Sequence, residues 1–406
     1  MPRKLAYLSG AARVSTHPEA EASGPRSHVL GILGGFRQLG WETDAFILGD
    51  LLPAQFSRQG SERFISGGGG RTYLADVFRL GLRPALPALA LRRLGDQVDW
   101  AYERFSAMQN LGEAFQRHGV PWILETNALL FAESSSDRRT IAMVSVAKAT
   151  EIQAYRRCDA LVCTSQVLAD LVIREARVDP HKIAVVPSGV DTEPFSSSHR
   201  TPRRMFDAST LGFVGALNPW QALHLPIEAI AELRREGIDY NLVVVGDGPM
   251  RHAWEELSGE LGQSAHVRFV GRVPWSEVPG FVLGFDLGFS GQTAPAIGEM
   301  YFSPLKLYEY MAAGHPVVVS NYPEAMEVVE EGITGYRFAP GDKEDLKRAL
   351  RVAYAQRDDW RAMGLRARAE TVKNHTWAHR VEAMISLLEP ILEERFGTAY
   401  PARRRR

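Results

Sequence analysis

Cysteine is scarce in this chain of 406 residues, and its charges nearly cancel. The two cysteines, Cys158 and Cys163, are too few for a disulfide framework or a structural zinc site. We therefore expect free, buried thiols in a reducing compartment. The formal net charge is −1, from 47 Lys and Arg against 48 Asp and Glu. This balance gives no strong electrostatic attraction to nucleic acid, so we expect no nucleic-acid partner.

Long apolar runs are also lacking, because no segment approaches the roughly eighteen apolar residues that a membrane span requires. No signal peptide is visible before the first expected strand, Leu5–Ser9, and we expect a soluble, cytoplasmic protein. No Gly-x-Gly-x-x-Gly follows that strand, which argues against a nicotinamide dehydrogenase. No Asp-x-Asp run and no histidine cluster indicates a metal site, so we expect no metal ion.

What the sequence does have is the composition of a globular protein, with 45% hydrophobic and 23% charged residues. Its length fits two domains of about 150 to 200 residues each. Strands and helices alternate in both halves, which predicts an α/β fold with parallel sheets covered by helices on both faces. The strands expected in the first half are Leu5–Ser9, Gly40–Leu48, Trp100–Tyr102, Pro121–Glu125, Ala160–Thr164 and Ile183–Val186. Those expected in the second half are Leu211–Gly215, Tyr240–Gly246, Val267–Val270, Asp286–Ser290 and Pro316–Ser320.

The boundary between the two halves is expected in the polar, proline-ended segment Phe195–Pro202. This places a first domain at residues 1–198 and a second at residues 205–374. Residues 375–406 then contain an amphipathic helix near Trp377–Arg395 and a basic tail, Arg403–Arg406. The glycine run Gly67–Gly70 predicts a flexible loop.

Residues 72–93 are apolar with interspersed arginines. One interpretation is a helical hairpin packed on the first domain and kinked at Pro84 and Pro87. The other is a peripheral contact with the anionic inner face of the cell membrane, because basic, apolar helical segments can lie on such surfaces.

Residues 301–320 are the most informative stretch, since they predict a loop, a capped helix and a buried strand. Ser303 suits the N-cap and Pro304 the first helical position. Gly314 supplies a left-handed stop before the apolar strand. Lys306 and Glu309 lie three residues apart and so share one face of the helix near its beginning. A helix N-terminus attracts anions, a lysine strengthens that attraction, and a neighbouring carboxylate can accept two hydrogen bonds from a ribose diol.

The run Ser-Pro-Leu-Lys-Leu-Tyr-Glu-Tyr-Met-Ala-Ala-Gly at residues 303–314 resembles the donor-site helix of retaining family 4 glycosyltransferases of the GT-B fold, in the form that one subgroup carries. Glu309 matches the second glutamate of the family motif, which grips the ribose. The first glutamate falls on Tyr301, which is a departure from the family. The arginine and lysine that the family usually places after the first strand of the second domain are replaced by Ala216 and Gln221.

The resemblance implies two Rossmann-like domains that face each other across a cleft, with the C-terminal helix crossing back to the first domain. It implies a retaining hexosyltransferase that takes a sugar from a nucleoside-diphosphate donor, with UDP favoured on family base rates. No metal ion and no further cofactor is expected. The acceptor hydroxyl, whether in a glycan, a glycolipid or a metabolite, is not identified.

The resemblance also assigns roles to loops at the strand ends of the second domain. Lys306 is expected to carry the charge of the diphosphate, with Ser303, Leu305 and Arg272 beside it. The loop Gly271, Arg272 and Val273 is expected to border the nucleobase. Further glycines expected to let loops approach a ligand in the cleft are Gly24, Gly215, Gly246 and Gly248.

Candidate contacts to the donor sugar or the acceptor are Arg26, His28, Arg104, Asn127, Glu299 and Tyr301. Several have a structural alternative. His28 could instead cap a helix expected at His28–Leu39, Arg26 could lie on the surface, and Glu103 or Arg104 could form a structural ion pair. Ser188 stands where the family usually has asparagine, in a segment that we interpret as the end of the first domain.

Two other functions remain open. A GT-B epimerase or phosphorylase fits the same alternation of strands and helices. A catalytically weak nucleotide-sugar-binding protein fits the losses at Ala216, Gln221 and Tyr301, although the retained Lys306 and Glu309 argue against it.

Overall fold

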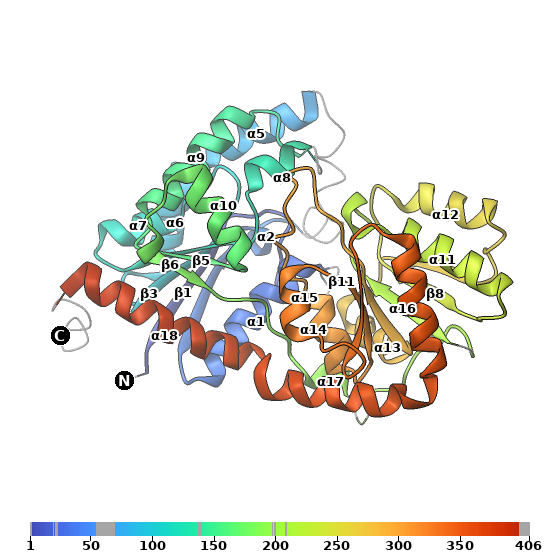
Figure 1. Ribbon diagram of the computed structural model, residues 1–406. Helices are drawn as coiled ribbons and strands as arrows, with labels where there is room; N and C mark the ends of the chain where they lie inside the picture. The colour runs from blue at the N-terminus through green and yellow to red at the C-terminus, as the bar shows by residue number, and fades with distance from the viewer. Residues whose placement is uncertain are drawn as a thin grey trace. The chain divides into compact units, whose positions relative to one another are not determined.

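The computed structural model describes residues 2–18, 20, 23–53, 70–136, 140–196, 198, 200–207 and 209–397. The chain divides into two compact units, residues 1–20, 29–187 and 377–406 on one side and residues 21–28 and 188–376 on the other. Each unit is built on a six-stranded parallel sheet flanked by helices (Figure 1). The predicted α/β class with two doubly wound domains is confirmed. The expected loop at 67–69 and the tail at 403–406 lie outside the described residues.

The sheet of the first unit has the strand order β2-β1-β3-β4-β5-β6. Its strands are β1 (Lys4–Ser9), β2 (Glu42–Ile47), β3 (Trp100–Arg104), β4 (Trp122–Thr126), β5 (Ala160–Cys163) and β6 (Ile183–Val185). Because β2 and β3 lie on opposite sides of β1, the strand order reverses between β1 and β3. Ligands of doubly wound sheets bind at the carboxyl ends of strands at such a reversal.

The helices before and between these strands are α1 (Gly24–Gln38), α2 (Leu48–Leu51), α5 (Gly70–Leu82), α6 (Ala85–Leu94), α7 (Gly112–Arg117), α8 (Leu130–Ser136), α9 (Val144–Arg157) and α10 (Gln166–Ala176). The first of them begins four residues earlier than the sequence predicts. The Arg26 N–H donates to the Ser23 hydroxyl at 3.3 Å, so Ser23 satisfies an amide of the opening turn. His28 lies inside the helix, and its alternative assignment as a cap is wrong.

The last helix, α18 (Trp377–Phe396), belongs to the first unit, as the resemblance implies. It packs on α1 where that helix has no side chains: a Cβ at Gly31 would lie 2.1 Å from the Trp377 indole, and one at Gly35 would lie 2.6 Å from Val381. Arg3 also forms an ion pair with Glu389 of α18 at 2.5 Å. No helix in the described residues is long and apolar enough to cross a membrane.

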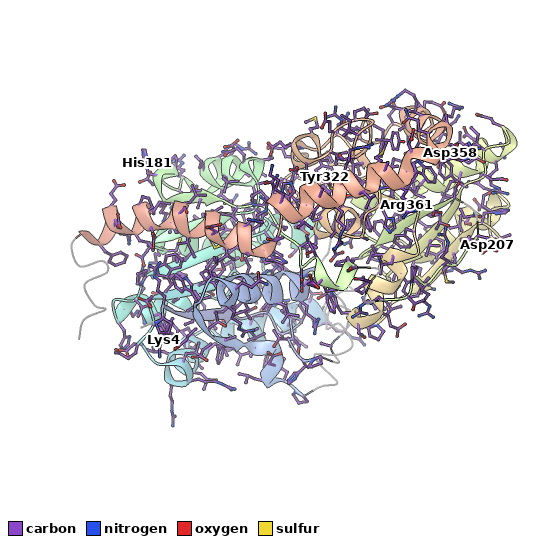
Figure 2. The ribbon with its side chains drawn as sticks, turned by 90° about the horizontal axis from the view of Figure 1, so that it is seen from below. Lys4, His181, Asp207, Tyr322, Asp358 and Arg361 are labelled. Carbon is purple, nitrogen blue, oxygen red and sulfur yellow. The ribbon has the colours of Figure 1, made fainter. Side chains whose placement is uncertain are left out.

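The sheet of the second unit has the order β12-β11-β10-β7-β8-β9. Its strands are β7 (Thr210–Val214), β8 (Asn241–Val245), β9 (Val267–Gly271), β10 (Leu287–Ser290), β11 (Val317–Ser320) and β12 (Gly335–Phe338). Its helices are α11 (His224–Arg235), α12 (Arg251–Glu260), α13 (Val278–Leu283), α14 (Leu305–Ala312), α15 (Pro323–Val328), α16 (Lys343–Ala355) and α17 (Trp360–Asn374). Figure 2 marks the beginning of α17 with Asp358 and Arg361.

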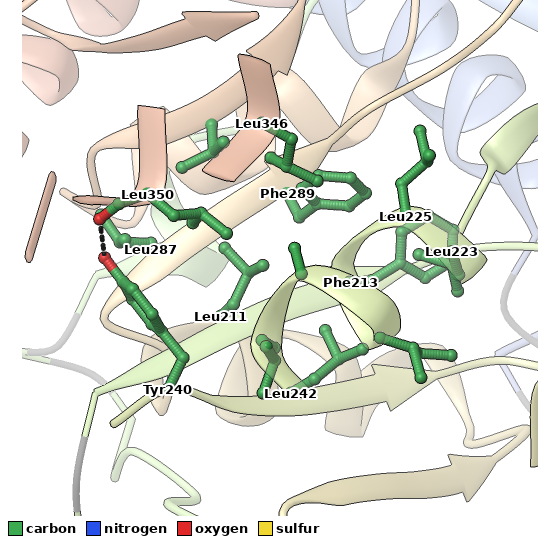
Figure 3. Close-up of a cluster of buried hydrophobic side chains, with 14 of the residues drawn as sticks. Leu211, Phe213, Leu223, Leu225, Tyr240, Leu242, Leu287, Phe289, Leu346 and Leu350 are labelled. Atoms are coloured by element: carbon green, nitrogen blue, oxygen red, sulfur yellow. Dashed lines mark hydrogen bonds between the residues drawn. The ribbon is translucent and has the colours of Figure 1, made fainter. Parts of the chain in front are cut away.

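Alternate residues of the central strands face two separate cores in this unit. Leu242 and Val244 of β8 pack with α11, α12 and α16, whereas Val243 and Val245 pack with α13, α14 and α15. Figure 3 shows the first of these cores, in which the Tyr240 hydroxyl donates to the Leu350 carbonyl at 3.0 Å. Continuous apolar runs are typical of parallel strands that are buried on both faces.

The division between the units falls at residues 187 and 188, before the polar segment 195–202 that the sequence indicates as a linker. The reason is packing, because Val190 and Phe195 are buried in the second core of the second unit. The two cysteines are free and buried, as expected. Burial raises the pKa of the Cys158 thiol to about 12, so it is an unreactive packing residue.

Candidate functional site

The order of strands in the second unit reverses at β7, with β8 on one side and β10 on the other. Helix α14 packs directly over this reversal. A Cβ at Gly288 of β10 would lie 2.2 Å from the Tyr310 ring, and the Val214 N–H at the end of β7 donates to the Tyr310 hydroxyl at 2.8 Å. The beginning of α14 and the loops after β7, β8 and β10 therefore meet where ligands of such sheets bind.

Lys306, the second residue of α14, is buried at this point. Its ammonium donates to the Gln221 side-chain oxygen at 2.7 Å and lies 3.8 Å from the centre of the Phe213 ring. Burial lowers the pKa of Lys306 from its usual 10.5 to about 7, and Glu309 opposes that shift. A cation held by a neutral amide and an aromatic face can still pair with an anion.

Glu309 lies one turn further along α14 and is partly buried. No ion pair joins Glu309 to Lys306, and within the described residues its carboxylate accepts no hydrogen bond. Burial raises the pKa of this carboxyl, and the neighbouring ammonium lowers it in part. The carboxylate therefore has all of its acceptor capacity available.

Gln221 has a role that the sequence did not reveal. It ends a short 3-10 turn, Pro219–Gln221, and the next residue, Ala222, adopts a left-handed conformation with φ 49°. That turn brings the buried Gln221 amide against the Lys306 ammonium. The residue that we interpreted only as the loss of a family cation positions the cation that remains.

Three of the glycines that we expected in the cleft, Gly215, Gly246 and Gly248, lie where two loops pack closely against each other. A Cβ at Gly246 would lie 1.9 Å from the Gly215 carbonyl oxygen, and one at Gly248 would lie 2.6 Å from the Leu217 nitrogen. The Leu217 N–H also donates to the Asp247 carbonyl at 3.1 Å. Close packing between the loops after β7 and β8 explains why these positions are glycine, independently of any ligand.

The loop after β9 is tied to the loop after β8. The Gly246 N–H donates to the Gly271 carbonyl at 2.9 Å, and Gly271 has φ 89°. The exposed Arg272 lies 3.8 Å from the Asp247 carboxylate, which offsets part of its charge. Val273 follows it and is partly buried.

The expectation that Ser303 caps α14 is wrong. The helix begins after Pro304, with no side-chain cap. The Ser303 hydroxyl instead accepts the Ser188 N–H at 2.7 Å and donates to the Glu324 carboxylate at 2.9 Å. These longer-range bonds use the hydroxyl that a cap would need. They also give Ser188 a role in holding the loop before α14, beyond the end of the first domain that the sequence indicates there.

The remaining candidates of the second unit lie near the beginning of α14 or in the opening turns of α1. Tyr301 is buried with its ring centre 5.3 Å from that of Phe302, and Glu299 is partly exposed. A Cβ at Gly24 would lie 3.9 Å from the Leu305 side chain. Arg26 and His28 follow in the same helix.

Gln292, just after β10, is a residue that the sequence reasoning missed. It is 3% exposed, and its side-chain oxygen has no hydrogen-bond partner in the described structure. The Ser320 hydroxyl donates to the Gln292 backbone carbonyl at 2.6 Å. The next residue, Thr293, donates its N–H to the Trp220 carbonyl at 2.8 Å. A buried amide oxygen without a partner costs about 1–3 kcal/mol, so such groups call for an explanation.

The first unit has a polar row at its own strand reversal. Ser9, Arg104 and Glu125 are directly opposed across β1, β3 and β4, so their side chains share one face of the sheet. The Asn127 amide donates to the Glu125 carboxylate at 3.1 Å. The Ser9 hydroxyl is buried and has no partner among the described residues.

Glu103 points to the opposite face, and its role is structural. Its carboxylate accepts the N–H groups of Leu111 and Gly112, both at 2.9 Å. Burial raises the pKa of this carboxyl to about 7, while the two amides oppose the shift. The two backbone amides, and not the suggested structural ion pair, anchor the Glu103 side chain. In the described part of the chain no group of three His, Cys, Asp or Glu side chains could hold a metal ion.

Two family models match the chain, and together they cover most of it. The glycosyl transferases group 1 model matches residues 204–370, and the glycosyltransferase family 4 model matches residues 22–194. These matches support the resemblance to glycosyltransferases.

Curated relatives are similar at 25–28% identity. A GDP-mannose-dependent alpha-(1-6)-phosphatidylinositol monomannoside mannosyltransferase of Mycolicibacterium smegmatis is 28% identical over 223 residues, 52% of this chain and 57% of the relative. A D-inositol 3-phosphate glycosyltransferase of Stackebrandtia nassauensis is 27% identical over 304 residues, 70% of this chain and 66% of the relative. The matches thus span less than two thirds of these relatives' length.

Solved structures share the fold at lower identity. Sucrose-phosphate synthase from Thermosynechococcus elongatus has a TM-score of 0.70 at 17% identity, over 97% of this chain and 100% of that chain. Anabaena HepE in complex with UDP and glucose has a TM-score of 0.61 at 18% identity, over 97% and 99%. The fold and the two family models together place this chain among the glycosyltransferases of the GT-B type.

Proposed function

We propose that this protein transfers a hexose from a nucleoside-diphosphate sugar, with UDP as the nucleotide, to an acceptor hydroxyl with retention of the anomeric configuration. The observation that carries the proposal is the Lys306 ammonium, which is buried at the strand reversal with a neutral amide as its hydrogen-bond acceptor. A diphosphate would supply the missing counter-charge. The structure of HepE with UDP and glucose supports the choice of nucleotide.

The leaving diphosphate gains negative charge as the glycosidic bond breaks, and fixed positive groups at that place lower the barrier. In this chain Lys306 and the N-terminal amides of α14, beginning with Leu305, would supply them. Arg272 would add charge at the rim. We propose that these groups do the work of a metal ion, so the reaction needs none.

We assign the ribose diol to Glu309, whose carboxylate keeps its acceptor capacity. The nucleobase is assigned to the loop Gly271–Val273. Gln292, Glu299 and Tyr301 are candidates for the donor sugar, with Arg26 and His28 beside them. The polar row around Arg104, together with Asn127, is our candidate for the acceptor hydroxyl.

A thermal-shift panel of nucleoside diphosphates and their sugars tests the proposal. A uridine diphosphate is expected to raise the melting temperature, since a ligand that binds only the folded state stabilises it. If none of the panel does so, the proposal is wrong. Conversion of the donor without acceptor would indicate an epimerase, and binding with neither hydrolysis nor transfer a catalytically weak binding protein. The anomeric configuration of the product, read by NMR, tests retention.

Replacing Glu309 with glutamine tests the ribose assignment. Hydrogen bonds to a charged group contribute about 1.5–3 kcal/mol, so Glu309→Gln should weaken UDP binding roughly 10- to 100-fold. Calorimetry with 2′,3′-dideoxy-UDP supplies the control, because the variant and the wild type should bind that analogue equally. An equal loss for both ligands would mean that Glu309 acts elsewhere.

Replacing Gln292 with methionine is expected to stabilise the ligand-free protein and to weaken nucleotide-sugar binding. The first effect, about 1 kcal/mol in the free energy of unfolding, follows from removing an unpaired buried oxygen. Gln263→Met is the matched control, since the Gln263 oxygen is also buried and unpaired but follows α12, away from the site. Urea denaturation and calorimetry with UDP and UDP-glucose measure both. If Gln292→Met destabilises the protein, the amide has a structural role.

We place the reaction in the cytoplasm, with contact to the inner face of the cell membrane through residues 72–93.

A further inference from the structure

Helix α5 of the first unit is amphipathic, but its apolar face points to solvent and buried polar residues lie on its inner face. Its outward side chains are large and apolar, with Tyr73 52%, Leu74 66%, Val77 46% and Phe78 58% exposed. These positions recur at intervals of four residues and so form one stripe along the helix. Surface helices of soluble proteins normally turn such a stripe toward the core. Figure 1 shows the helix at the outside of its unit.

Buried polar groups anchor the middle of α5, and Leu82 at its end packs against the core of the first unit. The buried Asp76 carboxylate accepts the N–H groups of Ala142 and Met143 at 2.7 and 2.8 Å and pairs with Arg79 at 2.5 Å. The Arg79 guanidinium also donates to the Thr140 carbonyl at 3.0 Å. This anchoring fixes the rotation of the helix, so the apolar stripe cannot turn inward without breaking buried hydrogen bonds.

The exposed charged residues of the α5–α6 hairpin are all positive. Residues 70–95 contain five arginines and one acid, and that acid is Asp76, which is buried. Arg71 at the beginning of α5 and Arg92 and Arg93 at the end of α6 are exposed. Leu89, also exposed, precedes the last two by three and four residues and shares their helix face.

We propose that the outer face of α5, formed by Tyr73, Leu74, Val77 and Phe78, docks into the surface of an anionic lipid bilayer. Apolar side chains would enter the boundary between headgroups and acyl chains, while Arg71, Arg92 and Arg93 pair with anionic headgroups. The inference rests on the membrane contact proposed above for residues 72–93 and names the helix face that makes it. The observations concern α5 and α6 alone, so it does not depend on the transfer reaction.

The charges favour a bilayer over a second copy of this chain. A symmetric dimer through α5 would add the exposed arginines of two hairpins without an exposed acid in either hairpin to pair with them, and like charges at an interface oppose association. An anionic membrane offers the opposite sign together with an apolar layer. Binding should therefore need both the apolar stripe and anionic lipid, and it should weaken as salt screens the charges.

Vesicle co-sedimentation of the full chain tests the inference. The wild type should bind vesicles that contain 30% phosphatidylglycerol in phosphatidylcholine. Its binding to vesicles of pure phosphatidylcholine should be at least five-fold weaker. Leu74→Glu with Phe78→Glu should reduce binding to the anionic vesicles at least ten-fold. Leu365→Glu is the control, because Leu365 on α17 is 60% exposed but has no exposed large apolar residue within four positions of it on that helix. This variant should bind as the wild type does.

Two further measurements keep the outcome clear. The melting temperature of each variant, compared with that of the wild type, shows whether the change at α5 leaves the fold intact. The same comparison with UDP present tests nucleotide binding separately, so a failure of the proposed function is distinguished from a failure of membrane docking. Light scattering shows whether the wild type is dimeric. Equal binding of wild type and double variant, equal binding to neutral vesicles, or a dimer that the double variant abolishes would each overturn the proposal.

Discussion

Lys306→Met is expected to abolish sugar transfer and at the same time to stabilise the ligand-free protein. Lys306 is 8% exposed, and its ammonium contacts an amide and an aromatic ring, while the nearby Glu309 carboxylate offsets part of the cost of burial without forming an ion pair. Removing a buried charge that lacks a carboxylate partner removes a desolvation cost. Removing it from the ligand complex leaves the diphosphate without its counter-charge, so UDP affinity should fall at least 100-fold.

The gain in stability should depend on pH in a defined way. The folded-state pKa of Lys306 is lowered to about 7, below its usual 10.5, so the unfolded chain binds the extra proton between these values. The cost of burial is therefore complete below pH 7 and disappears as the pH rises toward 10.5. The difference in melting temperature between Lys306→Met and wild type should be largest near pH 6 and shrink toward pH 10.

Lys347→Met is the matched control for this experiment. Lys347 is 7% exposed, but its ammonium is 2.5 Å from Glu232 and 3.0 Å from Glu344. Those carboxylates raise its pKa, the opposite direction to Lys306. The control should lose stability at neutral pH and keep UDP binding. Unchanged UDP affinity in Lys306→Met, measured by calorimetry, would contradict the assignment of the diphosphate to this residue.

Gly246→Ala is the second substitution with a large expected effect. Gly246 has φ 138°, and the new Cβ would lie 1.9 Å from the Gly215 carbonyl oxygen, which is backbone and cannot turn aside. A left-handed residue costs about 1–2 kcal/mol and overpacking about 1–3 more. The two loops must separate, which displaces the turn that holds Gln221 against Lys306, so UDP binding should also be lost.

Gly237→Ala separates the two causes. Gly237 also has a positive φ, of 82°, but nothing lies within 4 Å of its Cβ position. That variant should show only the conformational cost and keep UDP binding. Chemical denaturation gives the free energies of unfolding, and equal values for the two variants would mean that the contact between the loops does not matter.

Local signals predicted much of the fold. Continuous apolar strands between helical segments predicted two parallel sheets, since burial on both faces leaves its mark on each strand. Gly314 marked the end of α14, where φ is 79°. Ser303 shows the limit of this reasoning, because a serine before a helix is equally able to bond distant groups, and here Ser188 and Glu324 compete successfully for its hydroxyl.

The sequence by itself determined the two-sheet α/β class, the chemical character of the helix that carries Lys306 and Glu309, and the basic, apolar nature of residues 72–93. Periodicity, helix ends and composition are local, so they can be recognised without coordinates. Only the tertiary structure decided that Gln221 holds the Lys306 ammonium, that the Gln292 amide is buried unpaired, and that the apolar side of α5 faces outward. Each of these depends on which distant groups come within hydrogen-bonding distance, and that is fixed by the packing of loops and helices that are far apart in the chain.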